Sequence, residues 1–263
     1  TGGTRMFIEV NSDVGIEDLL RGLLIQSGND AAVALAEHVA GSVDGFVGEM
    51  NAAAGRLGMQ NTAFRNPHGL PTRGHYTTAR DLAVLAKAII DEFPDFYSLY
   101  AEREFSYNGI EQHNRNALLW RDPSVDGMKT GYTDSAGYCV VTSAKRDGMR
   151  LIAVVLGAPT PRVRNDGAQK LLEYGFGNFE THKLYSAGQE LDNARVWGGE
   201  IPFAGLGLTE DIYVTIPRGG YPKLAASMDV LAELSAPLAR GTRVGEVNIS
   251  FDGAPLIKSP LIV

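Results

Sequence analysis

Helical periodicity dominates the beginning of the chain. Apolar side chains recur at three- and four-residue spacing at Ile16, Leu19, Leu20, Leu23 and Leu24. This pattern predicts a helix over residues 15–25. An alanine-rich second helix follows, with Asn29 or Asp30 as its cap, and a third is predicted over residues 44–57.

Further along the chain, after one more helix, apolar and polar residues alternate in short segments. A fourth helix is predicted after the capping sequence at Thr78, and Pro94 ends or bends it. Strands are then predicted over residues 102–107, 125–130, 137–144 and 150–158. Asn108-Gly109 and Asp147-Gly148 are hairpin signals, so the strands should pair antiparallel, with a helix over residues 163–176 covering one face of the sheet.

The character of the chain changes near residue 180. Short alternating segments such as 212–216 and 243–250 follow, with Asp252-Gly253 as a hairpin turn. We therefore predict two domains, residues 1–179 and 180–263. The first is α+β, an antiparallel sheet with helices, and the second is a small all-β C-terminal domain.

Composition narrows the function classes. The chain has 31 acidic and 24 basic residues, a net charge of −7 and a pI near 5.3. This balance disfavours a nucleic-acid partner. The longest apolar run, residues 151–158, is far shorter than the roughly 20 residues that span a bilayer. The single cysteine, Cys139, excludes an intrachain disulfide, and its apolar neighbours predict a buried thiol.

No cofactor is predicted. The sequence has no His-Glu-x-x-His element and no glycine-rich phosphate loop, and His38, His113 and His182 have no partners at ligand spacing. We therefore expect no metal site.

Lys129-Thr130-Gly131 is the first candidate for chemistry. At the end of a strand, the ammonium of Lys129 supplies a counter-charge for a carboxylate and Thr130 supplies a hydrogen bond. Gly131 lets a substrate backbone lie against the strand. The alternative is a solvated strand edge.

Ser27-Gly28-Asn29 is the second candidate. It lies between two predicted helices, and one interpretation is a helix stop followed by a cap. In the functional interpretation, the Ser27 hydroxyl relays a proton and the Asn29 amide holds a peptide carbonyl.

Together these elements resemble the signature of penicillin-binding proteins and serine β-lactamases, Ser-x-x-Lys, Ser-Asp-Asn and Lys-Thr-Gly. The motifs of this chain are similar to those of low-molecular-mass D-alanyl-D-alanine carboxypeptidases: Ser27-Gly28-Asn29, Asn66-Pro67-His68-Gly69-Leu70, Asn114-Arg115-Asn116 and residues 125–133. The resemblance implies a β-lactamase/transpeptidase-like fold for residues 1–179.

The nucleophile of this family is the serine of Ser-x-x-Lys, and no serine of this sequence has a lysine three residues later. Either the sequence lacks its N-terminal portion or the chain has lost the nucleophile. The start at Thr1, without an initiator methionine, favours the first explanation.

The resemblance implies a role for each matching residue. Ser27 would shuttle a proton and Asn29 would position the peptide, while Lys129 would keep the cleft electropositive and bind substrate with Thr130 and Gly131. The backbone N–H of Tyr132 would be an oxyanion-hole donor.

Three further residues are weaker candidates. Arg164 would bind the substrate's terminal carboxylate, or it is a first-turn surface arginine. Arg115 and His68 would form the cleft wall, although a histidine beside a glycine turn is often structural.

The function implied is a serine D,D-carboxypeptidase that removes the terminal D-alanine from peptidoglycan stem pentapeptides through an acyl-enzyme, and that β-lactam antibiotics acylate. The alternatives are a serine β-lactamase and a nucleophile-free peptidoglycan-binding or scaffolding protein. The resemblance also implies a periplasmic protein, peripheral on the inner membrane through a C-terminal amphipathic helix that this sequence does not contain.

Overall fold

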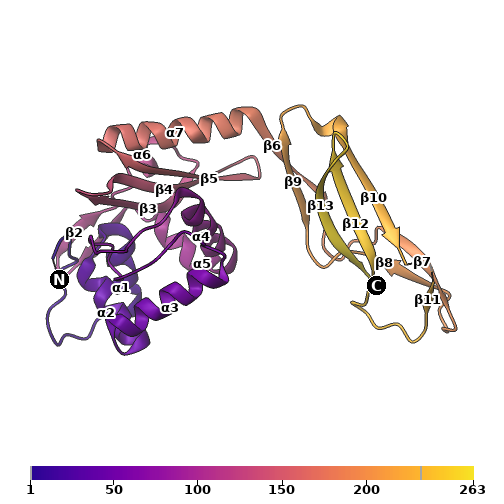
Figure 1. The fold of residues 1–263 in the computed structure, drawn as a ribbon, viewed down its shortest axis with the longest axis horizontal. Coiled ribbons are helices and arrows are strands. Elements are labelled where there is room, and N and C mark those ends of the chain that lie inside the picture. The colour runs from indigo at the N-terminus through magenta and orange to yellow at the C-terminus, as the bar shows by residue number, and fades with distance from the viewer. Residues whose placement is uncertain (1, 232) are drawn as a thin grey trace. The chain divides into compact units, whose positions relative to one another are not determined.

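A computed structural model describes residues 2–231 and 233–263. The chain divides into two compact units, residues 1–175 and 176–263 (Figure 1). The division falls inside helix α7 (Pro161–Asn178), a few residues before the boundary that the change in periodicity predicts. Each unit has its own set of strands, so the two are described separately.

Helices form most of the first half of unit 1. In chain order they are α1 (Ile16–Arg21), the π-helical turn η1 (Gly22–Gln26), α2 (Asn29–Ala40), α3 (Val43–Arg56), α4 (Ala79–Glu92), α5 (Pro94–Tyr97), the 3-10 turn η2 (Ser98–Ala101), α6 (Leu118–Arg121) and α7. The four helices predicted before residue 94 are confirmed. Ser42 and Thr78 cap α3 and α4 through hydrogen bonds from Gly45 N and Asp81 N.

The start of α2 differs from the prediction. Its N-cap is Gly28, which has no side chain, so neither Asn29 nor Asp30 occupies the cap position. The Asp30 carboxylate instead accepts hydrogen bonds from the backbone N–H groups of Met6, Phe7 and, at 3.3 Å, Ile8. A carboxylate at the start of a helix thus fixes the N-terminal segment of the chain to α2.

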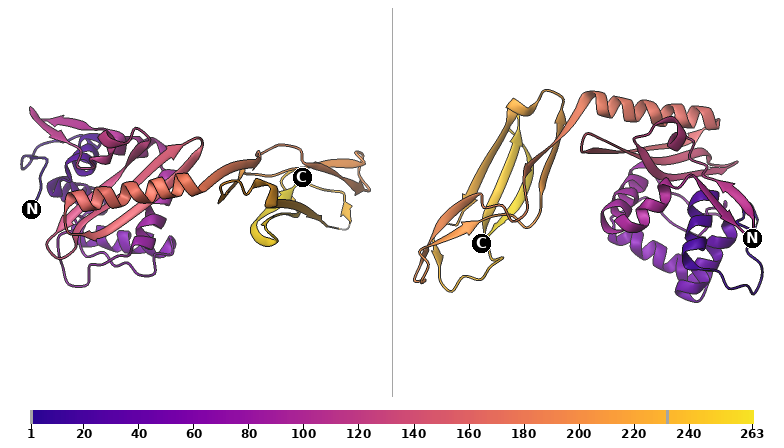
Figure 2. Two further views of the ribbon diagram at one scale, coloured as in Figure 1. Left: turned by 90° about the horizontal axis from the view of Figure 1, so that it is seen from above. Right: turned by 180° about the vertical axis from the view of Figure 1, so that it is seen from behind.

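An antiparallel sheet forms the centre of unit 1, as predicted. Its strands, in spatial order, are β3 (Val125–Thr133), β4 (Gly137–Arg146) and β5 (Met149–Ala158), and β1 (Glu104–Tyr107) pairs with β2 (Ile110–His113) in a separate hairpin. Helix α7 runs along one face of the sheet and α4 lies on the other (Figures 1 and 2). Gly175 permits close packing of α7, because a Cβ there would lie 2.4 Å from Leu151 Cδ1.

The predicted hairpin turns are confirmed by their backbone angles. Asn108-Gly109, Asp147-Gly148 and Asp252-Gly253 all have positive φ at both positions, between 47° and 81°. This is the conformation of a tight type I′ turn, which suits the right-handed twist of antiparallel strands. The register of three strand pairs is therefore set locally.

Unit 2 is built from strands, which confirms the predicted small β domain. They are β6 (Phe179–Tyr185), β7 (Asp192–Trp197), β8 (Phe203–Leu206), β9 (Ile212–Pro217), β10 (Leu224–Val230), β11 (Leu234–Ser235), β12 (Arg243–Phe251) and β13 (Ala254–Ile262), with a 3-10 turn η3 (Tyr221–Lys223). Inward side chains of the strands form its core, and Val214, Val247 and Leu261 are almost completely buried.

The one cysteine of the chain is more exposed than its apolar neighbours predicted. Cys139 was expected to be buried, but its side chain is only partly buried. Register pairs Cys139 with Gly131, whose missing side chain leaves the thiol uncovered on one side.

Among the helices of the described residues, none has both the length and the apolar character needed to cross a bilayer.

Candidate active site

All nine predicted site residues of unit 1 line one cavity of about 1230 Å³. They come from five parts of the chain: Ser27 with Asn29, His68, Arg115, residues 129–132 of β3, and Arg164 of α7. Residues up to 137 positions apart in sequence therefore meet at one surface. A concave site with convergent polar groups is the usual form of a small-ligand pocket.

Ser27 lies on a rigid turn between η1 and α2. Its backbone is in the left-handed region, with φ 63° and ψ 43°. Gly28 follows in close contact with two backbone groups, because a Cβ on it would lie 3.1 Å from Met6 N and 3.3 Å from Gly22 O. The tight π-helical turn and the left-handed serine together direct the hydroxyl into the cavity.

The side chain of Lys129 meets this hydroxyl across 102 positions of sequence. Lys129 Nζ donates hydrogen bonds to Ser27 Oγ and, at 3.0 Å, to the carbonyl oxygen of Thr130. Burial, together with the positive charges of Arg115 and Arg164, lowers the pKa of Lys129 from 10.5 to about 8. A fraction of this amine is consequently neutral near pH 7, roughly a tenth.

Asn29 lines the cavity, and its amide is engaged by the N-terminal segment of the chain. Its side chain is buried, and Nδ2 donates to the carbonyl oxygen of Gly2 at 2.7 Å, while its backbone N–H donates to Thr4 O at 2.8 Å. The amide that the resemblance assigns to the substrate therefore binds the N-terminal segment in this structure. The neighbouring Asp30 carboxylate holds the same segment against α2.

Strand β3 presents the other predicted residues in order. Thr130 is buried and Gly131 is exposed, and no heavy atom lies within 4 Å of the position that a Cβ on Gly131 would take. That open side fits the predicted approach of a ligand backbone. Tyr132 is half-exposed, stacks on Tyr138 at 4.2 Å between ring centroids, and donates from its hydroxyl to Asp134 Oδ1 at 2.7 Å.

The cationic wall is partly buried. Arg164 is only 6% exposed, which excludes the surface interpretation, and its Nε donates to Asn165 Oδ1 at 3.0 Å. Burial lowers the pKa of Arg164. Arg115 is exposed and donates from Nε to the carbonyl oxygen of Gln26 at 3.0 Å. With Lys129 they give the cavity three positive charges.

His68 fits the structural interpretation. Its Nδ1 accepts a hydrogen bond from the backbone N–H of Leu70 at 3.3 Å, and burial lowers its pKa. The same turn is held by Asn66, whose amide donates to Leu70 O at 2.9 Å and to Thr72 Oγ1 at 3.0 Å. A histidine whose nitrogen completes a turn is a wall residue rather than an acid or base.

Part of the cavity is apolar, which the sequence pattern did not predict. The lining includes Leu82, Leu85 and Ile89 of α4, with Met128 and Val141 of the sheet. The signal was present in the sequence, because Leu82, Leu85 and Ile89 recur at helical spacing and form one apolar face. What periodicity could not show is that this face borders a cavity as well as the sheet.

Within residues 2–231 and 233–263, one group has the composition of a metal site. Glu104, Glu111 and His113 lie together on the β1–β2 hairpin, because register places Glu104 opposite His113. His113 was expected to have no partners at ligand spacing, and the structure places two glutamates beside it that this spacing did not indicate. All three are exposed and none lines the cavity.

Two family models match parts of this chain. Residues 1–160 match the family described as D-alanyl-D-alanine carboxypeptidase, and residues 179–263 match the family described as penicillin-binding protein 5, C-terminal domain. The chain is 45% identical over 264 aligned residues to the D-alanyl-D-alanine carboxypeptidase DacA of Escherichia coli strain K12. That alignment covers 100% of the chain and 66% of the relative, so the chain spans just under two thirds of its length.

Solved structures give the same result. Penicillin binding protein 5 from Haemophilus influenzae has a TM-score of 0.89 and 43% identity, covering 99% of this chain and 77% of that chain. Penicillin-binding protein D2 from Listeria monocytogenes, in its ampicillin-bound form, has a TM-score of 0.58 and 36% identity. That match covers 62% of this chain and 68% of the other.

Proposed function

We propose, from the premise that this chain belongs to the D-alanyl-D-alanine carboxypeptidase family, that the whole protein removes the terminal D-alanine from peptidoglycan stem pentapeptides. The reaction would pass through an acyl-enzyme, and β-lactam antibiotics would acylate the same serine. That serine is not among these 263 residues, so the proposal concerns the protein that carries both it and this chain.

One observation carries the proposal: the contact between Lys129 Nζ and Ser27 Oγ inside a cationic cavity. A lysine with a pKa of about 8 can exchange a proton with the hydroxyl at neutral pH. The Ser27 hydroxyl can then hand a proton to the departing D-alanine amine. The pair provides a proton relay without a histidine.

The charge and shape of the cavity fit an anionic peptide end. Buried Arg164 and the Lys129 ammonium supply counter-charges for a terminal carboxylate, and the open side of Gly131 accommodates an extended backbone. The backbone N–H of Tyr132 would donate to the oxyanion. β-Lactams also carry a carboxylate, which the same cations would bind.

The location and membrane association belong to the same proposal. The stem peptide lies outside the cytoplasmic membrane, so an enzyme acting on it has to work in the periplasm or at the cell surface. We propose a periplasmic protein that rests on the inner membrane through a segment beyond this sequence.

The test compares two reactions of the whole protein. Release of D-alanine from a peptide ending in D-Ala-D-Ala is measured beside hydrolysis of benzylpenicillin, and the intact mass is recorded after exposure to the penicillin. We expect D-alanine release and a lasting single adduct. The Ser27→Ala variant should lose at least about tenfold in release, and Ser12→Ala, which removes an exposed hydroxyl outside the cavity, should not.

Each other outcome contradicts the proposal in a different way. Rapid penicillin hydrolysis without D-alanine release would indicate a serine β-lactamase. Binding of the peptide with neither release nor adduct would indicate a nucleophile-free binding protein.

A further inference from the structure

Asn114-Arg115-Asn116 connects β2 to α6, and all three side chains donate hydrogen bonds to backbone carbonyl groups. The acceptors of Arg115 and Asn116 lie on the segments that carry Ser27 and Lys129, and those of Asn114 lie in η2 and directly after it. A short connection that bonds to both halves of a site can control their separation.

Asn116 acts on the lysine strand. Its Nδ2 donates to the carbonyl oxygen of Gly127 at 3.0 Å, and Thr142 Oγ1 of β4 donates to the same oxygen at 2.8 Å. Asn116 is 1% exposed and Thr142 is 0% exposed. Hydrogen bonds in such a dry environment are strong, and an unpaired carbonyl there is costly. Gly127 is therefore held by two donors, two residues before Lys129.

Arg115 acts on the serine turn. Its Nε donates to the carbonyl oxygen of Gln26, the residue directly before Ser27. This contact joins the end of η1 to the same three-residue connection that holds β3. Both functional side chains are thus one or two residues from a carbonyl that residues 114–116 bind.

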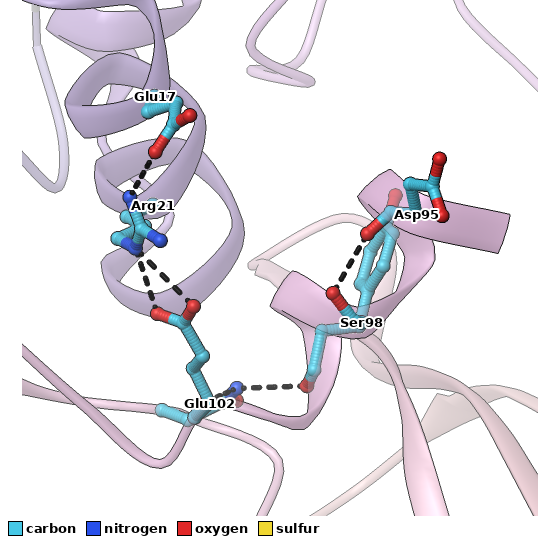
Figure 3. Close-up of polar contacts among 7 residues, drawn as sticks. Glu17, Arg21, Asp95, Ser98 and Glu102 are labelled. Carbon is cyan, nitrogen blue, oxygen red and sulfur yellow. Dashed lines mark hydrogen bonds and ion pairs between the residues drawn. The ribbon is translucent and has the colours of Figure 1, made fainter. Parts of the chain in front are cut away.

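Asn114 braces the connection itself. Its Oδ1 accepts from Asn116 N at 2.9 Å, and its Nδ2 donates to the carbonyl oxygen of Glu102 at 2.9 Å. The Glu102 carboxylate accepts two hydrogen bonds from Arg21 Nε at 2.9 and 3.2 Å, and Arg21 also pairs with Glu17 (Figure 3). Arg21 is the last residue of α1, and the chain continues through η1 to Ser27. These contacts therefore connect residues 114–116 to the segment that carries Ser27.

We propose that residues 114–116, together with Thr142, form a positioning clamp that holds Lys129 against Ser27. The inference rests on the proposed function and explains how the fold keeps Lys129 in contact with Ser27. Neither Asn116 nor Thr142 lines the cavity, so both act through the backbone and not on a ligand. Displacement of a reacting group by about 1 Å can cost about a hundredfold in rate, so two carbonyl contacts at this place matter.

The test removes the donors without changing bulk. Thr142→Val and Asn116→Leu each leave the Gly127 carbonyl with one donor, and the double variant leaves it with neither. The matched control is Asn51→Leu, because Asn51 also binds a carbonyl in unit 1, that of Phe64 at 3.0 Å, and does not line the cavity. Thermal unfolding confirms that each variant is folded. If Asn116→Leu fails to fold, Thr142→Val decides the question.

The first readout is the pKa of Lys129, followed by NMR on protein with 13C-labelled lysine, with the signal assigned from Lys129→Arg. The ionisable groups that act on this amine are Arg115 and Arg164, which all the clamp variants retain. In Thr142→Val and Asn116→Leu, we expect the pKa to rise from about 8 toward 10.5, because the ammonium leaves its enclosed position. In Asn51→Leu it should not change.

The second readout is D-alanine release by the whole protein. We expect kcat to fall about tenfold or more in the clamp variants while KM changes less, since the loss concerns the reacting groups and not peptide binding. A folded double variant with an unchanged Lys129 pKa would overturn the clamp. A shifted pKa in a protein that never releases D-alanine would support the clamp and refute the proposed function, so the two failures are distinguishable.

Discussion

Replacement of Lys129 by Met removes the charge of the side chain but keeps most of its bulk. Burial and two neighbouring arginines lower the pKa of this lysine from 10.5 to about 8. At 1.36 kcal/mol for each pKa unit, this gap corresponds to at most ~3 kcal/mol of destabilisation of the folded charged form. The value is an upper bound because the side chain is only partly buried.

The sign of the pH dependence follows from the lowered pKa. Below pH 8 the lysine is protonated in both states, so the folded protein carries the whole penalty. Between pH 8 and 10.5 the unfolded chain binds a proton that the folded chain has released, so wild-type stability rises with pH. The Met variant has no such gain. It also lacks the hydrogen bonds to Ser27 Oγ and Thr130 O, worth about 1 kcal/mol each.

The expected result is a loss of stability of the Met variant relative to wild type as pH rises. At pH 7 the Met variant should be more stable than wild type by at most ~1 kcal/mol, and at pH 10.5 it should be less stable by ~2 kcal/mol. Urea unfolding, with hydrogen exchange at amides of β4 as the probe, reports on unit 1 alone. The control is Lys87→Met, which removes an exposed lysine of α4 paired with Asp91 and should change stability by less than about 0.5 kcal/mol. A difference between the Lys129 variant and wild type that does not vary with pH would refute the reasoning.

Three other predictions concern stability. Gly127→Ala should reduce the free energy of unfolding by ~1–3 kcal/mol and so lower the melting temperature, because the new Cβ would lie 2.8 Å from Tyr97 Oη. At Gly131 the same position is open space, so Gly131→Ala should leave the melting temperature unchanged. Burial would raise the pKa of Asp122, but hydrogen bonds from Ser124, Gln169 and Arg146 outweigh it and lower the pKa to about 2. Its stabilisation, ~2 kcal/mol, is therefore present above pH 3.8 and lost as pH falls through 2; thermal unfolding of Asp122→Asn should show no such acid loss from this residue. Arg218 donates to the carbonyl oxygens of Phe176 and Phe179 at 2.7 and 3.3 Å. Arg218→Met should therefore lower the free energy of opening measured by amide exchange in unit 2 by ~1–2 kcal/mol, and an unchanged exchange rate would refute this contribution.

Local physical chemistry determined the elements of this fold. Spacing of apolar residues together with capping signals located α1 to α4 and α7. The dipeptides at 108–109, 147–148 and 252–253 fixed three hairpins, because Asn or Asp followed by Gly is the pair that tolerates two positive φ angles. These signals depend on a few neighbouring residues, so the chain itself contains them. The motifs Ser27-Gly28-Asn29 and Lys129-Thr130-Gly131 were also visible there, as was the family.

Only the tertiary structure decided what those residues contact. It brought Lys129 Nζ within hydrogen-bonding distance of Ser27 Oγ, buried Arg164, and left Cys139 partly exposed opposite a glycine. It also joined the Asn29 amide to Gly2 and the Asp30 carboxylate to three backbone donors 22 to 24 residues away. Such pairings arise when packing brings distant segments together, and burial then fixes the pKa values. Periodicity along the chain contains no information about either.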